Sequence, residues 1–157
     1  MLHLIPPPLH RAALRVAHDL RKRWWRWRKP RLVGCSIIAL DPCGRVLLVR
    51  HSYGNGSWAL PGGAVGRKED PADAARRELF EEVRCRVAEV QLVATMPELL
   101  HGAENVVYLY AGVTEDHPRA DGREIVDVRF FATEDLPHPL SRTVQPRLKL
   151  LAPSEQG

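Results

Sequence analysis

Three glutamates near the end of an alanine-rich segment constrain the fold of this chain more than any other feature. Asp70 is a good N-cap residue and Pro71 suits the first helical position, so a helix is predicted to begin here. Glu78, Glu81 and Glu82 are spaced so that all three project from neighbouring parts of one helical surface. A divalent cation relieves the repulsion between such carboxylates, and Mg²⁺ prefers oxygen ligands. The pattern predicts a metal-binding cluster on a rigid helix.

The same helix has an apolar arc that is expected to face a core. The members of this arc recur at helical spacing and are Ala72, Ala75, Leu79 and Val83. The alternative is that the glutamates form a solvated acidic face, and a generic Glu-x-x-Glu-Glu pattern favours that alternative. The residues around the glutamates therefore have to decide between the two.

Those residues resemble the Nudix box, G-x5-E-x7-R-E-U-x-E-E-x-G-U, in which U is a bulky apolar residue. The positions that match at the required spacing are Gly63, Glu69, Arg77, Glu78, Leu79, Glu81 and Glu82, with Cys85 as the final apolar residue. The second glycine of the box is replaced by Arg84. Because a non-glycine residue in a left-handed conformation costs about 1 kcal/mol, we expect altered loop geometry there rather than lost catalysis.

The resemblance implies an α+β fold, a Nudix-type α/β/α sandwich with a mixed sheet, over about residues 32–151. The residues outside the box agree with it, because runs with strand-like composition alternate with turn signals. Strands are predicted at 33–40, 45–51, 87–96, 105–113 and 125–131, with a short strand from Trp58 and a closing helix at 141–151.

The resemblance also implies an activity and a cofactor. Nudix hydrolases use water to cleave a nucleoside diphosphate linked to another group X, which gives a monophosphate and phosphorylated X. The implied metal is Mg²⁺, with Mn²⁺ as a substitute, and its implied ligands are Glu78, Glu81, Glu82 and the carbonyl of Gly62. Gly63, Glu69 and Arg77 are implied to support the site, the last two as a buried ion pair.

The general base and the substrate contacts are less constrained. In Nudix families the base is a box glutamate or an acidic residue on a remote loop, and the loop candidates here are Glu124 and Glu104. Arg50, Tyr53 and Trp58 precede the glycine turn and are candidates for binding a phosphate or stacking on a base. The alternative for each residue is a structural role.

The charge of the chain divides it into two parts. Residues 1–30 hold eight basic residues and one acidic residue, net +7, whereas the remainder holds fifteen and eighteen, net −3. We interpret 1–30 as a Trp/Arg-rich helical extension with its helix at about 10–28, 31–152 as the Nudix domain and 153–157 as a tail. A basic and aromatic run extends from Arg21 to Lys29. It favours docking of the Trp/Leu stripe on the domain or in a homodimer, with RNA or a membrane surface as alternatives.

Cysteine usage and hydropathy bear on the compartment. The three cysteines lack metal-site spacing, and no apolar run approaches the ~20 residues of a membrane span. A cytoplasmic nucleotide pyrophosphatase is expected. Two alternatives stay open, an RNA 5′-pyrophosphohydrolase and a noncatalytic nucleotide-binding regulatory module, which the Arg84 replacement favours.

Overall fold

The computed structural model of the chain describes residues 12–17, 32–100 and 103–151. Residues 12–17 are helical. The elements that follow are β1 (Leu32–Leu40), β2 (Val46–His51), β3 (Trp58–Ala59), β4 (Gly62–Ala64), α2 (Pro71–Val83), β5 (Gln91–Leu100), β6 (Ala103–Val113), β7 (Ile125–Phe131) and α3 (Val144–Lys149). In these ranges no helix is long and apolar enough to cross a membrane.

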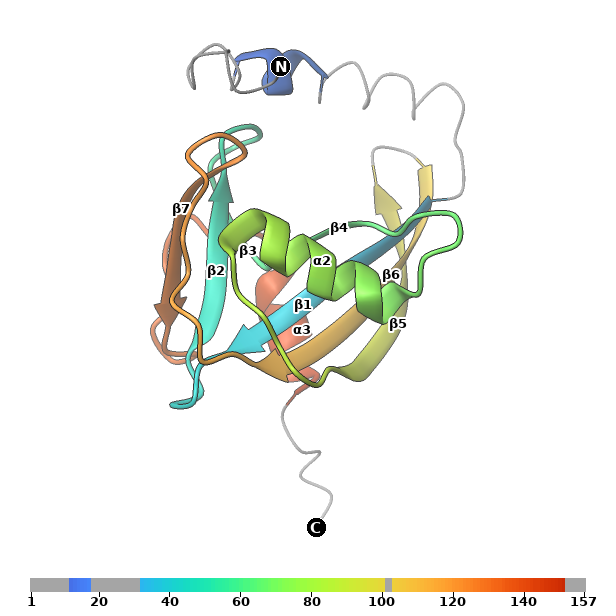
Figure 1. Cartoon of the computed structure of the whole chain (residues 1–157). Helices are drawn as coiled ribbons and strands as arrows, with labels where there is room; N and C mark the ends of the chain where they lie inside the picture. Colours follow the sequence, from blue (N-terminus) through green and yellow to red (C-terminus); the bar gives the residue numbers. More distant parts are fainter. Residues whose placement is uncertain (1–11, 18–31, 101–102, 152–157) are drawn as a thin grey trace.

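The strands form one mixed sheet with the order β3-β2-β1-β6-β5, in which β4 also pairs with β1 and β7 with β2. β1 and β6 run parallel over nine pairs, and the other pairings are antiparallel. β1 and β2 pair at Leu40 and Val46, beside the turn that joins them, and then diverge (Figure 1). The sheet therefore has two wings, β4-β1-β6-β5 and β3-β2-β7.

Helices cover both faces of the sheet, with α2 on one face and α3 on the other (Figure 1). Alternate strand residues supply two buried clusters, because successive side chains of a strand point to opposite faces. Ile37 and Leu47 pack with Leu79 beneath α2, whereas Ile38 and Leu48 belong to the cluster on the α3 side. This layering confirms the predicted α/β/α sandwich with a mixed sheet.

Two predicted elements differ from the structure by three or more residues at one end or both. The strand predicted at 87–96 begins at Gln91 and extends to Leu100, because residues 84–90 form a loop that packs on β6 at Gly112. The helix predicted at 141–151 is confined to Val144–Lys149. The first residue of the predicted helix instead bonds to β3, because the N–H of Ser141 donates to the carbonyl of Trp58 at 2.8 Å.

The helix predicted at 10–28 can be compared with the structure only at residues 12–17, and its Trp24 and Trp27 lie outside the described residues. Within 12–17 the apolar stripe is exposed, with Val16 at 60%. The contact with the domain is made by Arg15, whose Nε–H donates to the carbonyl of Ser52 at 2.9 Å. In this part of the chain the contact is polar rather than the predicted apolar docking.

Candidate active site

α2 forms as its sequence predicts. Asp70 is the N-cap in an extended conformation, and its carboxylate accepts hydrogen bonds from the N–H groups of Ala72 and Asp73. The predicted apolar arc faces the core, where Leu79 and Val83 are fully buried. This docking leaves no freedom for the helix to rotate, so the glutamates on the neighbouring arc have set directions.

The three box glutamates differ in exposure. Glu82 is only 5% exposed, and the side chain of Glu78 is 16% exposed. Glu81 is 56% exposed. Oε2 of Glu82 is buried and has no hydrogen-bond partner among the described residues. A solvated acidic face is therefore excluded for Glu78 and Glu82, and a buried carboxylate oxygen without a partner calls for a cation or a donor.

The glycine turn lies against this pair of carboxylates, and each glycine is required for a different reason. A Cβ atom on Gly62 would lie 2.3 Å from the carbonyl oxygen of Cys35 in the adjacent strand β1. A Cβ atom on Gly63 would lie 2.4 Å from Cδ of Glu78. The first glycine therefore permits strand pairing, and the second leaves space for the Glu78 carboxylate.

Glu69 and Arg77 form the implied ion pair. Arg77 donates from Nε at 2.8 Å and from Nη2 at 3.0 Å to the two carboxylate oxygens, and Nη2 also reaches the carbonyl of Ala64 at 3.0 Å. The hydrogen bonds from Arg77 and from the N–H of Gly66 lower the pKa of Glu69 to about 2. The implication that this pair is buried is wrong, because the side chains of Arg77 and Glu69 are 37% and 24% exposed.

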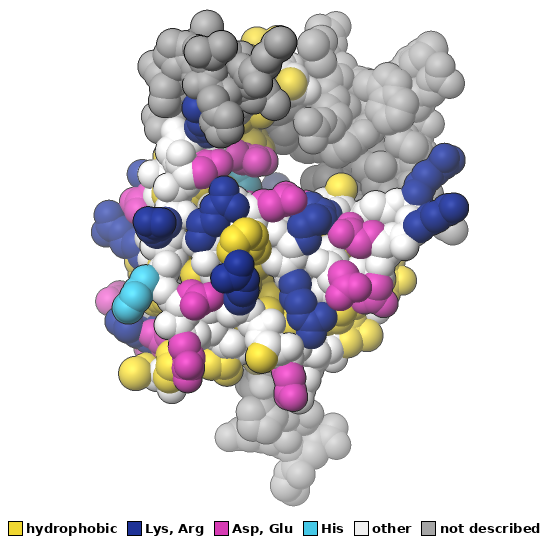
Figure 2. All heavy atoms as spheres, in the orientation of Figure 1, with side chains coloured by type: hydrophobic (Ala, Val, Ile, Leu, Met, Phe, Trp, Pro, Cys, Tyr) yellow, Lys and Arg dark blue, Asp and Glu magenta, His cyan; other side chains and the backbone are white. Residues whose placement is uncertain are grey.

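Arg77 also supplies positive charge to two of the box glutamates. Its Nη1 lies 2.9 Å from Oε1 of Glu78 and 3.3 Å from Oε2 of Glu81. Acidic and basic side chains are interspersed over the face that carries α2 (Figures 1 and 2). Glu82, in contrast, has no arginine contact of this kind among the described ion pairs.

The electrostatics of Glu78 and Glu82 fit a divalent cation. Burial, followed by the charges of Glu78 and Glu124, holds the pKa of Glu82 well above its usual value. Burial also raises the pKa of Glu78, although the Arg77 hydrogen bond opposes it. A cation beside the pair would offset both the lost hydration and the mutual repulsion. Among the described residues no three Asp, Glu, His or Cys side chains form a ready-made metal cluster, and Glu81 points toward Arg77 and solvent.

A second wall beside Glu78 and Glu82 is built by Glu124 and its neighbours. The charge of Glu124 contributes to the raised pKa of both Glu78 and Glu82, so the three carboxylates share one region. Asp121, which the sequence indicated only as part of a turn, also acts on Glu82, and its Oδ1 accepts the N–H groups of Arg123 and Ile125. A single carboxylate in a loop belongs to no motif, so the sequence could not have indicated this role for Asp121.

Glu104 and Trp58 are placed elsewhere. Glu104 pairs with Leu99 near the tip of the β5–β6 hairpin and is not among the charges that act on Glu78 or Glu82. Trp58 is 6% exposed and packs edge-on against Phe131, with ring centroids 5.0 Å apart. The structural alternative therefore holds for Trp58, which is a core residue on the α3 side.

Arg50 and Tyr53 lie in different surroundings. The guanidinium of Arg50 lies 5.2 Å from the ring centroid of Trp58, and Nη2 lies 3.8 Å from Oδ2 of Asp127. The hydroxyl of Tyr53 donates to Oε1 of Glu124 at 3.4 Å. Tyr53 thus belongs to the Glu124 wall, whereas Arg50 lies against the sheet.

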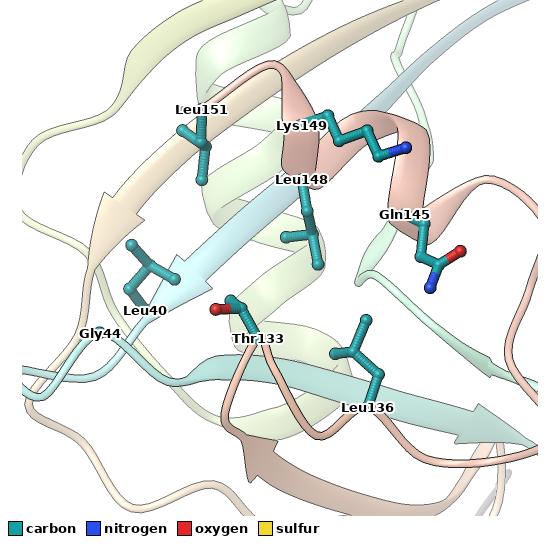
Figure 3. A pocket seen from close by; sticks show the side chains of 8 residues that line it. All are labelled: Leu40, Gly44, Thr133, Leu136, Gln145, Leu148, Lys149 and Leu151. Carbon is teal, nitrogen blue, oxygen red and sulfur yellow. The ribbon is translucent and has the colours of Figure 1, made fainter. Parts of the chain in front are cut away.

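Two cavities lie outside the carboxylate cluster. One of about 650 Å³ is formed by the β2–β3 loop and the segment before α3, and Tyr53 is on its wall. The other, of about 490 Å³, lies on the α3 side, where the side chains of Leu40, Leu136 and Leu148 point toward one another (Figure 3). The second cavity has no acidic lining residue, so only the first is connected to the carboxylate region through Tyr53 and Glu124.

Arg84 occupies the position of the second box glycine without changing the turn. Its φ of 62° and ψ of 26° are left-handed, and its N–H donates to the carbonyl of Phe80 at 2.9 Å. Among the described non-glycine residues it alone has positive φ. The expectation of altered loop geometry is therefore wrong, because the arginine adopts the conformation for which the box uses glycine, and retains the strain.

Comparisons with known proteins identify the family of this chain. Residues 30–152 match the family model described as NUDIX domain. NAD-capped RNA hydrolase NudC of Edwardsiella ictaluri is 30% identical over 76% of this chain and 47% of its own length. RNA pyrophosphohydrolase of Pectobacterium atrosepticum is 39% identical over 38% of this chain and 33% of its own length.

The chain thus spans half or less of these two curated relatives. A crystal structure of a MutT NUDIX hydrolase from Burkholderia pseudomallei superimposes with a TM-score of 0.71 at 26% identity, covering 78% of this chain and 99% of that one. The family model matches most of this chain, and the box residues lie together at one site. This chain therefore belongs to the Nudix hydrolase family.

Proposed function

We propose that this protein is a metal-dependent pyrophosphohydrolase that cleaves a nucleoside diphosphate linked to another group X into a nucleoside monophosphate and phosphorylated X. One observation carries the proposal. The buried carboxylate of Glu82 has an oxygen without a partner, and it lies with Glu78 beside the glycine turn. Burial of a carboxylate oxygen without a partner destabilises the protein when no metal is bound. This arrangement is therefore better explained by cation binding than by a contribution to stability.

In this proposal Glu78 and Glu82 hold Mg²⁺ or Mn²⁺ together with the carbonyl of Gly62, and Glu81 adds a ligand when it leaves Arg77. Bound there, the metal would supply positive charge for the diphosphate oxygens and would acidify a water molecule. Arg77 and Glu69 keep the loop at 64–69 against α2, because their bonds join the two. Their role is to preserve the geometry of the carboxylates.

Glu124 is proposed as the general base. Water attacks one phosphorus, its oxygen forms a bond to that phosphorus, and the anhydride bond to the bridging oxygen breaks. The proton of the water passes to the Glu124 carboxylate, and the second phosphate leaves with the bridging oxygen. Glu124 suits this step because it lies on a loop, is exposed, and acts electrostatically on Glu78 and Glu82.

The cavity beside Tyr53 is proposed to accept part of the substrate. Its volume of about 650 Å³ falls in the range of small-molecule sites, roughly 300–1,000 Å³. Ser57, Ser141 and Thr143 give it polar groups, and Arg142 adds a cation. These groups are suited to a polar, negatively charged nucleotide more than to an apolar ligand.

RNA 5′-pyrophosphohydrolysis is a second candidate. The names of the two curated relatives favour it, and so does the basic run from Arg21 to Lys29 in the sequence. The noncatalytic alternative rested on Arg84, and the left-handed conformation of Arg84 removes that basis. Small diphosphates and RNA therefore remain as the two substrate classes to separate.

A substrate panel tests the proposal. The purified chain and Glu82→Gln would be incubated with Mg²⁺ and five compounds, namely NADH, ADP-ribose, UDP-glucose, 8-oxo-dGTP and 5′-triphosphorylated RNA, and the products resolved by chromatography. We expect cleavage at a phosphoric anhydride that drops at least about 100-fold in Glu82→Gln. Glu89→Gln, an exposed glutamate in the loop after α2, is the matched control. Equal rates for wild type and Glu82→Gln would refute the metal site.

Salt dependence separates the two substrate classes. Binding through phosphate contacts releases counterions, so a rate on triphosphorylated RNA that depends on Arg21–Lys29 should fall steeply with salt at subsaturating RNA. We expect neutralising Lys22, Arg23 and Arg26 to remove most of that dependence if RNA is the substrate. A salt-independent RNA rate that the neutralised variant retains would argue for a small diphosphate instead.

A further inference from the structure

The end of β2 is attached to Glu124 through the backbone. The pairing of β2 with β7 shifts register between Arg50 and His51, so that His51 pairs with Ile125. The next residue, Ser52, is 5% exposed, and its N–H donates to the carbonyl of Glu124 at 2.8 Å. The main chain of Glu124 is therefore held at a buried point of the sheet.

The side chain of Glu124 is held by Tyr53, the residue that follows Ser52. The hydroxyl of Tyr53 donates to Oε1 of Glu124 at 3.4 Å, and the Tyr53 ring packs on His51 with centroids 4.9 Å apart. Two consecutive residues, Ser52 and Tyr53, thus contact the backbone and the carboxylate of the same glutamate. We call these two residues the Ser52–Tyr53 corner.

The same corner is bound from the N-terminal part of the chain. The Nε–H of Arg15, in the helical residues 12–17, donates to the carbonyl of Ser52 at 2.9 Å. Hydrogen bonds from a charged donor are stronger than those between neutral groups. Ser52 therefore uses its N–H to hold Glu124 and its C=O to hold Arg15, and the two contacts lie within one residue. The family model begins at residue 30, so Arg15 lies outside it.

We propose that the Ser52–Tyr53 corner positions Glu124 and that Arg15 links the N-terminal segment to it, which makes Tyr53 and Arg15 positioning residues for the hydrolytic step. The role in catalysis rests on the proposed function, because it requires Glu124 to act on the substrate. The segment at 12–17 then influences turnover through Ser52 rather than through contact with substrate. A substrate-binding role for Arg15 or Tyr53 predicts a different kinetic result.

Amide hydrogen exchange tests the corner without any substrate. NMR would follow exchange of the Ser52 N–H in wild type, Arg15→Ala and Tyr53→Phe. We expect about fivefold faster exchange in Arg15→Ala and a smaller increase in Tyr53→Phe, because each removes one hydrogen bond from the corner. Arg86→Ala and Tyr108→Phe are matched controls in which the rate stays unchanged, since neither residue contacts the corner. Unchanged exchange in both corner variants overturns the proposal.

Kinetics test the link to Glu124. On whichever of the five panel compounds wild type cleaves fastest, Tyr53→Phe and Arg15→Ala should each lower kcat about threefold to tenfold and leave KM within about twofold. Neither substitution should lower kcat further in a Glu124→Gln background, because residues acting through one group are not additive. Arg15→Lys, which keeps a charged donor, should recover part of the loss.

The other outcomes separate the alternatives. A raised KM with unchanged kcat would mean that Arg15 or Tyr53 binds substrate, and an equal loss in the Glu124→Gln background would mean that they act elsewhere. Either result overturns the positioning role. If none of the five compounds is cleaved, the proposed function fails. The exchange rates then still decide whether Arg15 and Tyr53 hold the corner to which Glu124 is attached.

Discussion

The two walls of the site carry similar charges on very different supports. One wall is a single helix, where Glu78 and Glu82 are four residues apart and both largely buried. The other wall consists of Asp121 and Glu124, which are exposed and lie on the segment before β7. The helix wall follows from local spacing, whereas the loop wall depends on the pairing of β2 with β7.

The helix wall is rigid, whereas the loop wall can adjust. A buried carboxylate on a docked helix has one direction. The packing of α2 on the core beneath it offsets the free energy that burial of this carboxylate costs when no metal is bound. An exposed carboxylate on a loop is directed by individual hydrogen bonds, such as those from Ser52 and Tyr53 to Glu124. We therefore expect loss of a carboxylate on either wall to remove most of the activity, whereas substitution of the residues that direct Glu124 should only tune it.

The largest loss of activity is expected from replacing Glu124 on the loop wall. Glu124→Gln should lower kcat at least about 100-fold on the panel compound that is cleaved fastest, because a positioned base contributes about 10²–10⁴ in rate. Glu104→Gln is the matched control, since Glu104 lies on the β5–β6 hairpin. Equal activities of the two variants, measured by steady-state kinetics, would remove Glu124 from the mechanism.

The glycine turn offers a test of how closely the helix wall must be positioned. Gly63→Ala puts a Cβ atom at 2.4 Å from Cδ of Glu78 and should displace that carboxylate. We expect activity to fall about tenfold or more, because small misplacements of a catalytic group are costly. Gly66→Ala is the control, since its Cβ would lie 3.4 Å from its nearest neighbour, a side-chain atom of Glu69. A fully active Gly63→Ala enzyme would show that Glu78 tolerates movement.

Arg84 tests whether the end of the helix wall is strained. Arg84→Gly should stabilise the protein by about 1 kcal/mol, because glycine adopts positive φ without a Cβ clash. That change corresponds to a rise of roughly 2–4 °C in the melting temperature. Arg86→Gly should have the opposite sign, since Arg86 is not at positive φ. Thermal unfolding followed by circular dichroism measures both, and a lower melting temperature for Arg84→Gly would contradict the strain.

The smallest effect concerns pH and the Glu69–Arg77 pair. The pKa of Glu69 is lowered from 4.5 to about 2, so the folded state favours its ionised form. Its contribution to stability is present above pH 4.5 and is lost as the pH falls toward 2. The gap in melting temperature between wild type and Glu69→Gln should therefore shrink over that window. A gap that stays constant down to pH 2 would mean that the bonds to Arg77 do not stabilise the fold.

Much of the helix wall could be predicted because its information is local. Capping by Asp70, the apolar arc and the spacing of Glu78 and Glu82 all act within about a dozen residues, and the structure agrees with each. The exposure of the ion pair could not be predicted, because it depends on which segments pack over Arg77 and Glu69 in the folded chain. Trp58 was a candidate for substrate binding with a structural role as the alternative, and only its burial in the folded chain decides for the structural role.

The loop wall shows the limit of the sequence most clearly. Asp121 and Glu124 carry no spacing that distinguishes them from other surface acids, and Glu104 was also a candidate from sequence. The register shift at His51 and the hydrogen bond from Ser52 bring Glu124 to the site, and Arg15 reaches the same point from 37 residues away. None of these contacts leaves a pattern in the residues themselves.

By itself the sequence determined the α2 helix, its glutamates, the glycine turn and membership of the family, because helix periodicity and steric need for glycine act over short distances. The tertiary structure alone decided that Glu82 is buried without a partner, that Glu81 faces Arg77, and which loop acid joins the site. Burial and charge–charge distances arise only when segments far apart in the chain pack together, and those quantities set the chemistry of a carboxylate.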